Sequence, residues 1–205
     1  ACDPRRSPDR GTLALLADLA NAAGRRALAG ANLGEPALDL LERPVPDLYV
    51  LELSSFQLET TYSLEAAAAT VLNVTAGHLD RYDARADYAD AKARIFDGCE
   101  VAVVNADDPL VRAMPRTGQA VLSFSLEDAR ADYFLARDPE PMLVSRGEFL
   151  LPLSALRLKG LHNAANALAA LALCEALGVP RGPALDALPA FGGLPHRTQW
   201  VADVD

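Results

Sequence analysis

The stretch Asp47–Glu59, DLYVLELSSFQLE, decides the fold of this chain. Its residues Leu48–Leu53 are apolar except for Glu52, and a short continuous apolar run of this kind is typical of a parallel strand covered by helices on both faces. Two serines follow, and the composition of Phe56–Ala68 predicts a helix. The stretch therefore predicts a strand, a turn and a helix, which is the repeating unit of an α/β protein.

Glu52 is the one charged residue in this strand. An unpaired carboxylate costs several kcal/mol in a buried strand, so it stays charged only where a cation or several donors meet it. Glu52 also stands at the carboxyl end of the strand, where open α/β sheets bind their ligands. We therefore predict a metal-binding or ligand-binding carboxylate. The alternative is a glutamate that points outward beside the sheet edge.

Composition predicts a globular chain with one domain of above-average size, or one domain plus fragments, and it argues against two classes of partner. The chain has 205 residues, of which 51% are hydrophobic and 23% charged, with a formal net charge of −9. This charge argues against nucleic acid or an anionic membrane as the main partner, although a local site can still hold an anionic nucleotide. The cysteines Cys2, Cys99 and Cys174 have no metal-binding spacing, so we expect free thiols in a reducing cytoplasm. We also expect a monomer.

The rest of the chain alternates between the two kinds of element. Helices are predicted at Thr12–Ala29, Pro36–Leu41, Tyr88–Phe96, Asp107–Met114, Gly160–Leu177 and Arg181–Leu188, and further strands at Ala69–Val74, Glu100–Asn105 and Ala120–Ser125. Short extended pieces separated by turns are predicted at Tyr133–Ala136, Pro141–Ser145 and Glu148–Leu153. We therefore predict an α/β fold: the buried strands form one mainly parallel sheet flanked by helices, and the short pieces form a small antiparallel sheet.

Polar residues cluster where these elements begin or end. Glu52 ends one predicted strand, and His78 lies just beyond another. Asn163 and Asn166 share a face near the start of a long helix. A carboxylate and a histidine suit a divalent cation, and helix N-termini suit phosphate. Each residue also has a plain alternative: a loop histidine bonded to backbone, asparagines that cap the helix, and, for Lys92, a solvated surface lysine.

These motifs resemble the central domain of the Mur ligases, the amide ligases of peptidoglycan synthesis. The resemblance rests on a combination of segments that runs from about Gly11 to the end of the chain: ELSSFQLE, HLDRY, AKARIF, VVNADD, GLHNAANALAALAL and GLPHR. It implies a P-loop-like central ATP-binding domain over residues 1–198, with residues 199–205 starting the connection to a further domain. SSFQLE disfavours other amide ligases of the superfamily, such as folylpolyglutamate synthases.

The resemblance implies a reaction and a set of site residues. ATP would phosphorylate the carboxylate of UDP-MurNAc-L-alanine, and the amino group of D-glutamate would attack the acyl phosphate. Two Mg²⁺ ions would bring the like-charged reactants together. Glu52, His78 and a carbamylated Lys92 are implied as metal ligands and catalytic residues. The implied nucleotide contacts are Thr12, Asn163, Asn166 and Arg197, and the implied substrate contacts are Asn32, Ser54, Ser55 and Gln57.

Two departures from the family pattern affect this prediction. The family carries a phosphate-binding loop GTNGKST, and here the aligned residues Arg6–Thr12 read RSPDRGT. Both backbone-closing glycines are gone, Pro8 removes a donor, Asp9 repels phosphate, and Arg10 replaces the lysine. Ala76-Gly77 precedes His78, where the members that add D-glutamate have an acidic residue directly before the histidine.

Two hypotheses follow from these departures. The first is the ATP-binding domain of a ligase that functions only in the intact protein, and the second is a decayed, non-catalytic nucleotide-binding or scaffold domain. The chain opens without Met and stops at Asp205 without a terminating pattern, so we expect a piece of a longer protein. Damage and divergence both explain the altered loop.

Overall fold

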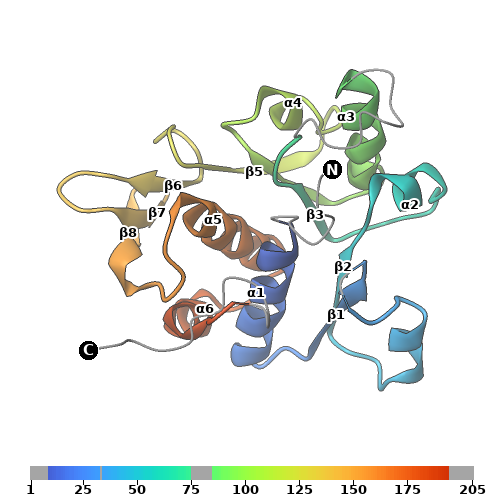
Figure 1. The fold of residues 1–205 in the computed structure, drawn as a ribbon, viewed down its shortest axis with the longest axis horizontal. Coiled ribbons are helices and arrows are strands. Elements are labelled where there is room, and N and C mark those ends of the chain that lie inside the picture. The colour runs from blue at the N-terminus through green and yellow to red at the C-terminus, as the bar shows by residue number, and fades with distance from the viewer. Residues whose placement is uncertain (1–8, 33, 75–84, 194–205) are drawn as a thin grey trace.

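The computed structural model describes residues 9–32, 34–74 and 85–193, and within them the strands form two hydrogen-bonded sheets (Figure 1). The first has two parallel strands, β1 (Ala27–Ala31) and β2 (Leu48–Glu52). The second has six strands in the order β3-β4-β5-β6-β7-β8. Their bounds are Ala68–Val71, Val101–Asn105, Ala120–Ser125, Tyr133–Ala136, Met142–Ser145 and Glu148–Pro152. Strands β3 to β6 pair in parallel, whereas β6, β7 and β8 pair antiparallel.

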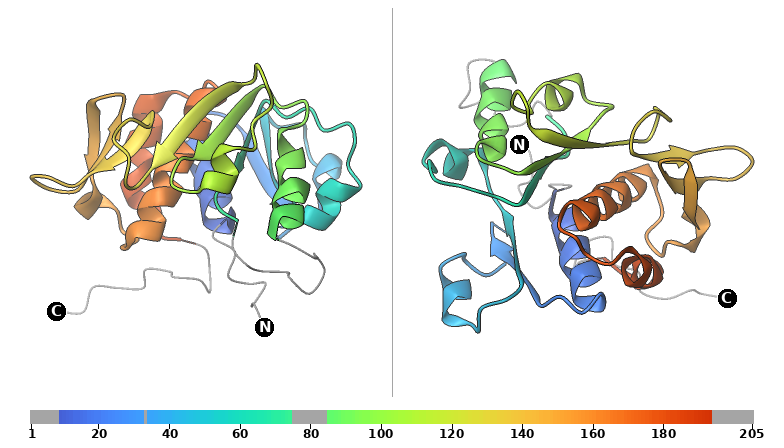
Figure 2. Two further views of the ribbon diagram at one scale, coloured as in Figure 1. Left: turned by 90° about the horizontal axis from the view of Figure 1, so that it is seen from above. Right: turned by 180° about the vertical axis from the view of Figure 1, so that it is seen from behind.

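Helices cover both faces of the sheets, as expected for buried parallel strands (Figure 2). The α-helices are α1 (Asp9–Ala22), α2 (Ser55–Glu59), α3 (Arg85–Ala93), α4 (Pro109–Arg112), α5 (Leu161–Ala176) and α6 (Arg181–Ala187). The 3₁₀ turns are η2 (Asp39–Glu42), η3 (Arg94–Phe96), η4 (Leu153–Ala155) and η5 (Leu188–Ala190). Helices α1, α5 and α6 belong to one core cluster, and α3 and α4 pack in a second cluster against β3 and β4.

Helix α5 is the centre of the larger core. Its apolar residues from Ala164 to Cys174 are almost completely buried, as their Ala/Leu-rich sequence predicts. It packs against β3, β4, β5 and β6 on one side and against α1 on another, while α1 packs on β1 and β2 (Figure 1). The contact between α1 and α5 therefore joins the two sheets into one body.

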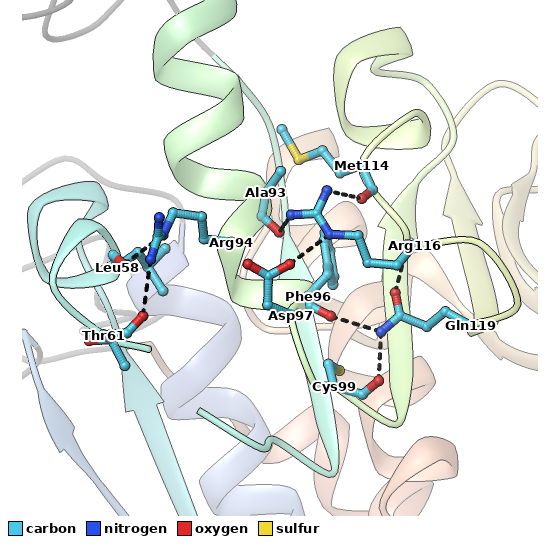
Figure 3. Close-up of polar contacts among 10 residues, drawn as sticks. All are labelled: Leu58, Thr61, Ala93, Arg94, Phe96, Asp97, Cys99, Met114, Arg116 and Gln119. Atoms are coloured by element: carbon cyan, nitrogen blue, oxygen red, sulfur yellow. Dashed lines mark hydrogen bonds and ion pairs between the residues drawn. The ribbon is translucent and has the colours of Figure 1, made fainter. Parts of the chain in front are cut away.

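Side chains of arginine and glutamine hold the opposite layer together (Figure 3). Arg94, directly after α3, donates to the carbonyl oxygens of Leu58 at 2.9 Å and Thr61 at 3.3 Å, which ties α2 and its following loop to α3. The amide of Gln119 donates to the carbonyl oxygens of Phe96 at 3.0 Å and Cys99 at 2.6 Å. These bonds satisfy backbone carbonyls at element ends, where regular structure leaves them without a partner.

The α/β prediction is confirmed, but the sheet differs from the expected arrangement in two ways. Leu48–Glu52 shares no hydrogen-bonded sheet with the strands from Ala68 onward. The antiparallel strands are also not a separate sheet, because β6 pairs in parallel with β5 and so extends the main sheet. Strand order depends on contacts far apart in sequence, which the local pattern does not encode.

Two predicted helices extend at least seven residues too far. The helix predicted at Thr12–Ala29 ends at Ala22, because Gly24 takes a left-handed φ of 80° and ends it in a turn. The residues that follow form β1, and its sequence of small residues resembles the continuation of an alanine-rich helix. The helix predicted at Phe56–Ala68 ends at Glu59, and Thr60–Ala67 is a loop.

Two further sequence-based expectations concern cysteines and membranes. Cys99 and Cys174 are buried free thiols, as predicted, while Cys2 lies outside the described residues. Burial raises the pKa of Cys174 to about 12. In the described part of the chain, none of the helices has the length and apolar character needed to cross a membrane.

Candidate functional site

Glu52 is held at the shared carboxyl end of β1 and β2. Its side chain is 6% exposed. Asn32, just after β1, donates from Nδ2 to Glu52 Oε1 at 3.4 Å and from its backbone N–H to the Glu52 carbonyl oxygen at 3.0 Å. Both residues reach this point because parallel strands end at the same edge. Asn32, predicted as a substrate contact, therefore lies directly beside the predicted metal ligand.

Lys92 approaches the end of β3 from α3. Its Nζ donates to the Asn73 carbonyl oxygen at 3.1 Å and lies 5.2 Å from the centre of the Tyr88 ring. The side chain is only partly buried and is thus not a fully solvated surface lysine. An ammonium group in this position can donate hydrogen bonds but cannot coordinate a metal ion.

Thr12 and Asn166 join the N-terminal turns of α1 and α5. Thr12 is fully buried, and its Oγ1 donates to Asn166 Oδ1 at 3.1 Å. The helices approach so closely here that a Cβ atom on Gly11 would lie 2.8 Å from Asn166 Nδ2. Asn163, one turn earlier on α5, donates from Nδ2 to the Lys159 carbonyl oxygen at 2.9 Å. The predicted nucleotide contacts of α1 and α5 therefore lie together.

The serines and glutamine after β2 form the start of α2. Ser54 is the N-cap, its Oγ accepts from the Gln57 N–H at 3.3 Å, and the Gln57 side chain accepts from the Ser54 N–H at 2.8 Å. This reciprocal pair is a capping box, which the spacing S-x-x-Q signals in sequence. Ser55 is buried at 6% exposure. The substrate-binding role of these three residues stays a prediction, and the capping role of Ser54 and Gln57 was missed.

Two other side chains position the end of β3. Asn105 Nδ2 donates to the Leu72 carbonyl oxygen at 2.8 Å, and Asp108 accepts from the Val74 N–H at 2.8 Å while also capping α4. With the bond from Lys92 to Asn73, three consecutive backbone positions are held. Sequence reasoning missed Asp108, although an acidic residue directly before the proline of a short helix is a recognisable N-cap signal.

A cavity of about 320 Å³ brings the candidate residues together. Thr12, Glu52 and Lys92, from α1, β2 and α3, all line it, and its remaining lining is largely apolar: Leu13, Leu16, Leu48–Leu51, Leu53, Leu58, Leu64–Val71, Leu72, Ile95, Leu173 and Leu177. We call this space the β2–β3 cavity. His78 and Arg197 lie outside the described residues. Among the described residues, no group of three or more His, Cys, Asp or Glu side chains could hold a metal ion.

The structure is that of an α/β domain with a cavity that Thr12, Glu52 and Lys92 line, and comparison with known proteins identifies the family. The family model for the Mur ligase middle domain matches residues 35–174. The chain therefore belongs to the Mur ligase middle-domain family.

Relatives within the family have a common name. A UDP-N-acetylmuramoylalanine–D-glutamate ligase of Nitrosococcus oceani is 53% identical over 193 residues, covering 93% of this chain and 43% of that protein. The same-named ligase of Methylobacillus flagellatus is 52% identical over 194 residues, with 93% and 43% coverage. The chain thus spans less than half the length of these relatives.

Solved structures share the fold. A UDP-N-acetylmuramoyl-L-alanyl-D-glutamate–2,6-diaminopimelate ligase superposes with a TM-score of 0.81 at 25% identity, over 97% of this chain and 47% of that one. MurF ligase of Thermotoga maritima, solved in complex with ADP, superposes with a TM-score of 0.75 at 20% identity, over 94% and 48% of the two chains.

Proposed function

We propose that this chain is the ATP-binding central domain of a ligase that joins D-glutamate to UDP-MurNAc-L-alanine in peptidoglycan synthesis. The observation that supports the proposal best is the arrival of Thr12, Glu52 and Lys92, from three separate elements, at one cavity. The names of the relatives supply the substrates. We further propose that the intact protein works as a cytoplasmic monomer, that residues 1–198 form this domain, and that residues 199–205 begin the connection to another.

The residues present fit Mg²⁺ in part. Glu52 offers a buried carboxylate, which is the kind of oxygen ligand that Mg²⁺ prefers. Lys92 fits only after reaction with CO₂, because a carbamate is an anionic oxygen ligand whereas an ammonium group repels a cation. Glu52, His78 and carbamylated Lys92 would then hold the metal. Bound Mg²⁺ would neutralise the negative charge of the triphosphate.

The other residues bind and orient the nucleotide. The start of α1 carries the partial positive charge of a helix N-terminus, and Thr12 adds a hydroxyl that can turn from Asn166 toward a phosphate oxygen. Asn163 and Asn166 offer amides to the nucleotide, and Arg197 would meet its phosphates. The phosphoryl group leaves ADP for the substrate carboxylate, and the D-glutamate amine then displaces phosphate and loses a proton.

This chain alone should bind ATP weakly and should not form the amide bond. Hydrogen bonds to charged groups contribute about 1.5–3 kcal/mol each, and RSPDRG in place of GTNGKS over Arg6–Gly11 removes two or three of them. Calorimetry with ATP and Mg²⁺ should therefore show little heat for this chain and clear binding after GTNGKS is restored. Neither version should ligate D-glutamate, because the chain spans less than half of the related ligases.

A second substitution and the behaviour of the restored chain together separate the ligase-domain hypothesis from the decayed-scaffold hypothesis. In the restored chain, Glu52→Gln should remove the Mg²⁺ dependence of ATP binding, because the amide loses the charge that holds the cation. Equal micromolar binding by the original and restored chains would mean that Arg6–Gly11 is not an altered phosphate loop. Absence of binding by the restored chain would favour the decayed scaffold domain.

A further inference from the structure

The chain leaves β3 through three residues that lie beyond its ladder with β4. The register of the ladder ends at the pair Val71 and Val104, and residues 72–74 follow it without strand structure. Side chains bind these residues instead. Asn105, the last residue of β4, donates from Nδ2 to the Leu72 carbonyl oxygen at 2.8 Å. The segment after β3 is thus held at the carboxyl edge of the sheet, where α/β folds place their sites.

The next peptide group of this segment is bound at both of its ends. The Asn73 carbonyl oxygen accepts from Lys92 Nζ at 3.1 Å, and the Val74 N–H donates to Asp108 Oδ2 at 2.8 Å. A carbonyl group and the N–H of the following residue belong to one planar peptide unit. Asp108 and Lys92 therefore hold opposite sides of the same rigid plane.

The charges of the two side chains match the dipole of this peptide. A carboxylate accepts from the positive N–H end, and an ammonium group donates to the negative carbonyl end. Each bond polarises the group between them and so strengthens the other bond. The Asn73–Val74 peptide thus links Asp108 to Lys92 more strongly than it would link two neutral partners.

Asp108 is fixed independently of this peptide. Its Oδ1 accepts from the N–H of Leu110 at 3.0 Å and from that of Val111 at 3.4 Å, which makes it the N-cap of α4. Its two oxygens therefore have separate partners, one pair in α4 and one residue after β3. Because the side chain of Val111 is fully buried, the cap stands on packed structure and sets where Oδ2 lies.

Lys92 is constrained from its own helix as well. Tyr88, one turn earlier in α3 and 7% exposed, has its ring centre 5.2 Å from Lys92 Nζ, which is within the range of a cation–π contact. Helices α3 and α4 lie next to each other and belong to the same core cluster (Figure 1). With the Tyr88 ring fixed by burial, the remaining freedom of Nζ depends on where the Asn73 carbonyl lies.

We propose that Asp108 is a positioning residue for Lys92 and acts through the Asn73–Val74 peptide. Asp108 fixes the plane of this peptide, and the plane sets the direction of the carbonyl that holds Lys92 Nζ beside the β2–β3 cavity. A carbamate on Nζ would keep one N–H, so the same carbonyl can hold Lys92 before and after reaction with CO₂. The consequence for nucleotide binding rests on the proposed function, whereas the positioning itself does not.

The substitution Asp108→Ser separates the two contacts of this residue. Serine is a good N-cap, so its hydroxyl can serve α4, but its single oxygen cannot also hold the Val74 N–H. The matched control is Asp107→Ala, which removes the same charge one residue earlier. Asp107 accepts from Ser125 Oγ and from the Leu126 N–H at the end of β5, so its loss leaves the Val74 contact in place.

Acetylation of lysine provides the readout, because the chain has two lysines and both donate to backbone carbonyls. Lys159 Nζ donates to the carbonyl oxygens of Ser154 at 2.8 Å and Leu156 at 2.7 Å, and it serves as the internal reference. Brief treatment with acetic anhydride followed by peptide mass spectrometry gives the ratio of Lys92 to Lys159 acetylation. Asp108→Ser should raise this ratio about threefold or more, as expected for one lost hydrogen bond, and Asp107→Ala should leave it unchanged. General loosening of the fold would raise both lysines together.

Nucleotide binding gives a second readout in the chain with GTNGKS restored. Asp108→Ser should weaken its Mg²⁺-dependent binding of ATP about threefold or more relative to Asp107→Ala, because Lys92 no longer has a fixed position. Absence of ATP binding by the restored chain before either substitution would contradict the proposed function. The acetylation ratio would then decide the positioning role alone.

Three results would overturn the proposal. These are an unchanged acetylation ratio in Asp108→Ser, an equal rise in Asp107→Ala, and equal ATP affinity of the two variants in a restored chain that binds ATP. Should Asp108→Ser fail to fold, hydrogen exchange of the unchanged chain decides the question. The Val74 amide should exchange at least about tenfold more slowly than in an unfolded peptide, and exchange at the unfolded rate would refute the contact with Asp108.

Discussion

The polar groups beside β6 and β7 are arranged differently from those between β2 and β3. At the β6–β7 end, Asp132, Tyr133, Arg146 and Glu175 form a network whose members satisfy one another: Tyr133 donates to Glu175 at 2.6 Å, and Arg146 meets Glu175 at 2.9 Å and Asp132 at 3.3 Å. At the β2–β3 end, Thr12, Glu52, Lys92 and backbone groups of two strands face a common cavity. The polar groups of the first region thus pair with one another, whereas those of the second region line a cavity.

The β6–β7 network also shows how position changes ionisation. Burial raises the pKa of Tyr133, and its hydrogen bond to Glu175 raises it further. Burial acts in the same direction on Asp132, but hydrogen bonds from Ser123 and Arg146 outweigh it and hold the pKa of this carboxyl below its usual range. These shifts keep the Tyr133 phenol protonated and the Asp132 carboxyl ionised at neutral pH, as their hydrogen bonds require.

The largest expected effect comes from the core beneath the β6–β7 end. Phe124 is 1% exposed, so Phe124→Ala should lower the free energy of unfolding by about 3–5 kcal/mol through lost burial and a cavity. Phe149→Ala, on the edge strand β8 of the same sheet but 63% exposed, should change the free energy of unfolding by about 0.5 kcal/mol or less. Denaturant titration measures both. Equal effects would contradict the assignment of stability to this core.

Thr12→Val tests the junction of α1 with α5. Removal of the hydroxyl leaves Asn166 Oδ1 without its donor in a buried position, so stability should fall by about 1–3 kcal/mol. Thr12→Ser keeps the hydroxyl and should retain more of the stability. If Thr12→Val were neutral, the hydroxyl would contribute nothing to the junction, and a role in ligand binding alone would remain for it.

Tyr133→Phe should change how the free energy of unfolding depends on pH in alkaline solution. The raised pKa means that the folded chain keeps the phenol proton at a pH where the unfolded chain loses it. The protonated Tyr133 phenol therefore contributes fully to the free energy of unfolding below about pH 10. This contribution is lost as pH rises, at up to about 1.4 kcal/mol per pH unit. Stability of the unchanged chain should fall more steeply above pH 10 than that of Tyr133→Phe, and parallel curves would refute the pKa shift. At neutral pH the substitution should cost about 1 kcal/mol.

The smallest effect is expected at the capping box beside the cavity. Ser54→Ala should cost about 0.5–1 kcal/mol, because the Gln57 N–H loses its acceptor at the start of α2. The exposed serine in the following loop, Ser63→Ala, is the matched control and should be neutral. Faster exchange of the Gln57 amide in Ser54→Ala alone would locate the effect. If Ser54→Ala lowered the free energy of unfolding by more than about 2 kcal/mol, the cap would stabilise packing beyond the first turn of α2.

Local patterns predicted the element types well and the sheet poorly. Ala120–Ser125 and Tyr133–Ala136 have the predicted bounds, because apolar runs between turn residues are local signals. Strand β1 was missed because its sequence ALAGA has little to distinguish it from the preceding helix. The gap between β2 and β3 could not be predicted, since pairing joins residues far apart in the chain.

For the candidate site, the sequence named residues but not the contacts between them. The motifs named Glu52, Lys92, Thr12 and Asn166, and the structure places the first three at one cavity and joins Thr12 to Asn166. The Asn32 contact with Glu52 depends on the β1–β2 pairing, which was not predicted, and so it was missed.

The bond between Thr12 and Asn166 joins residues separated by 154 positions, which has a consequence for synthesis. A ribosome adds about 5–20 residues per second, so α1 waits roughly eight to thirty seconds for the helix against which it packs. During that time the leucines Leu15, Leu16 and Leu19, buried in the finished domain, have no α5 to cover them. The nascent chain therefore presents an apolar helix to chaperones before its core can close.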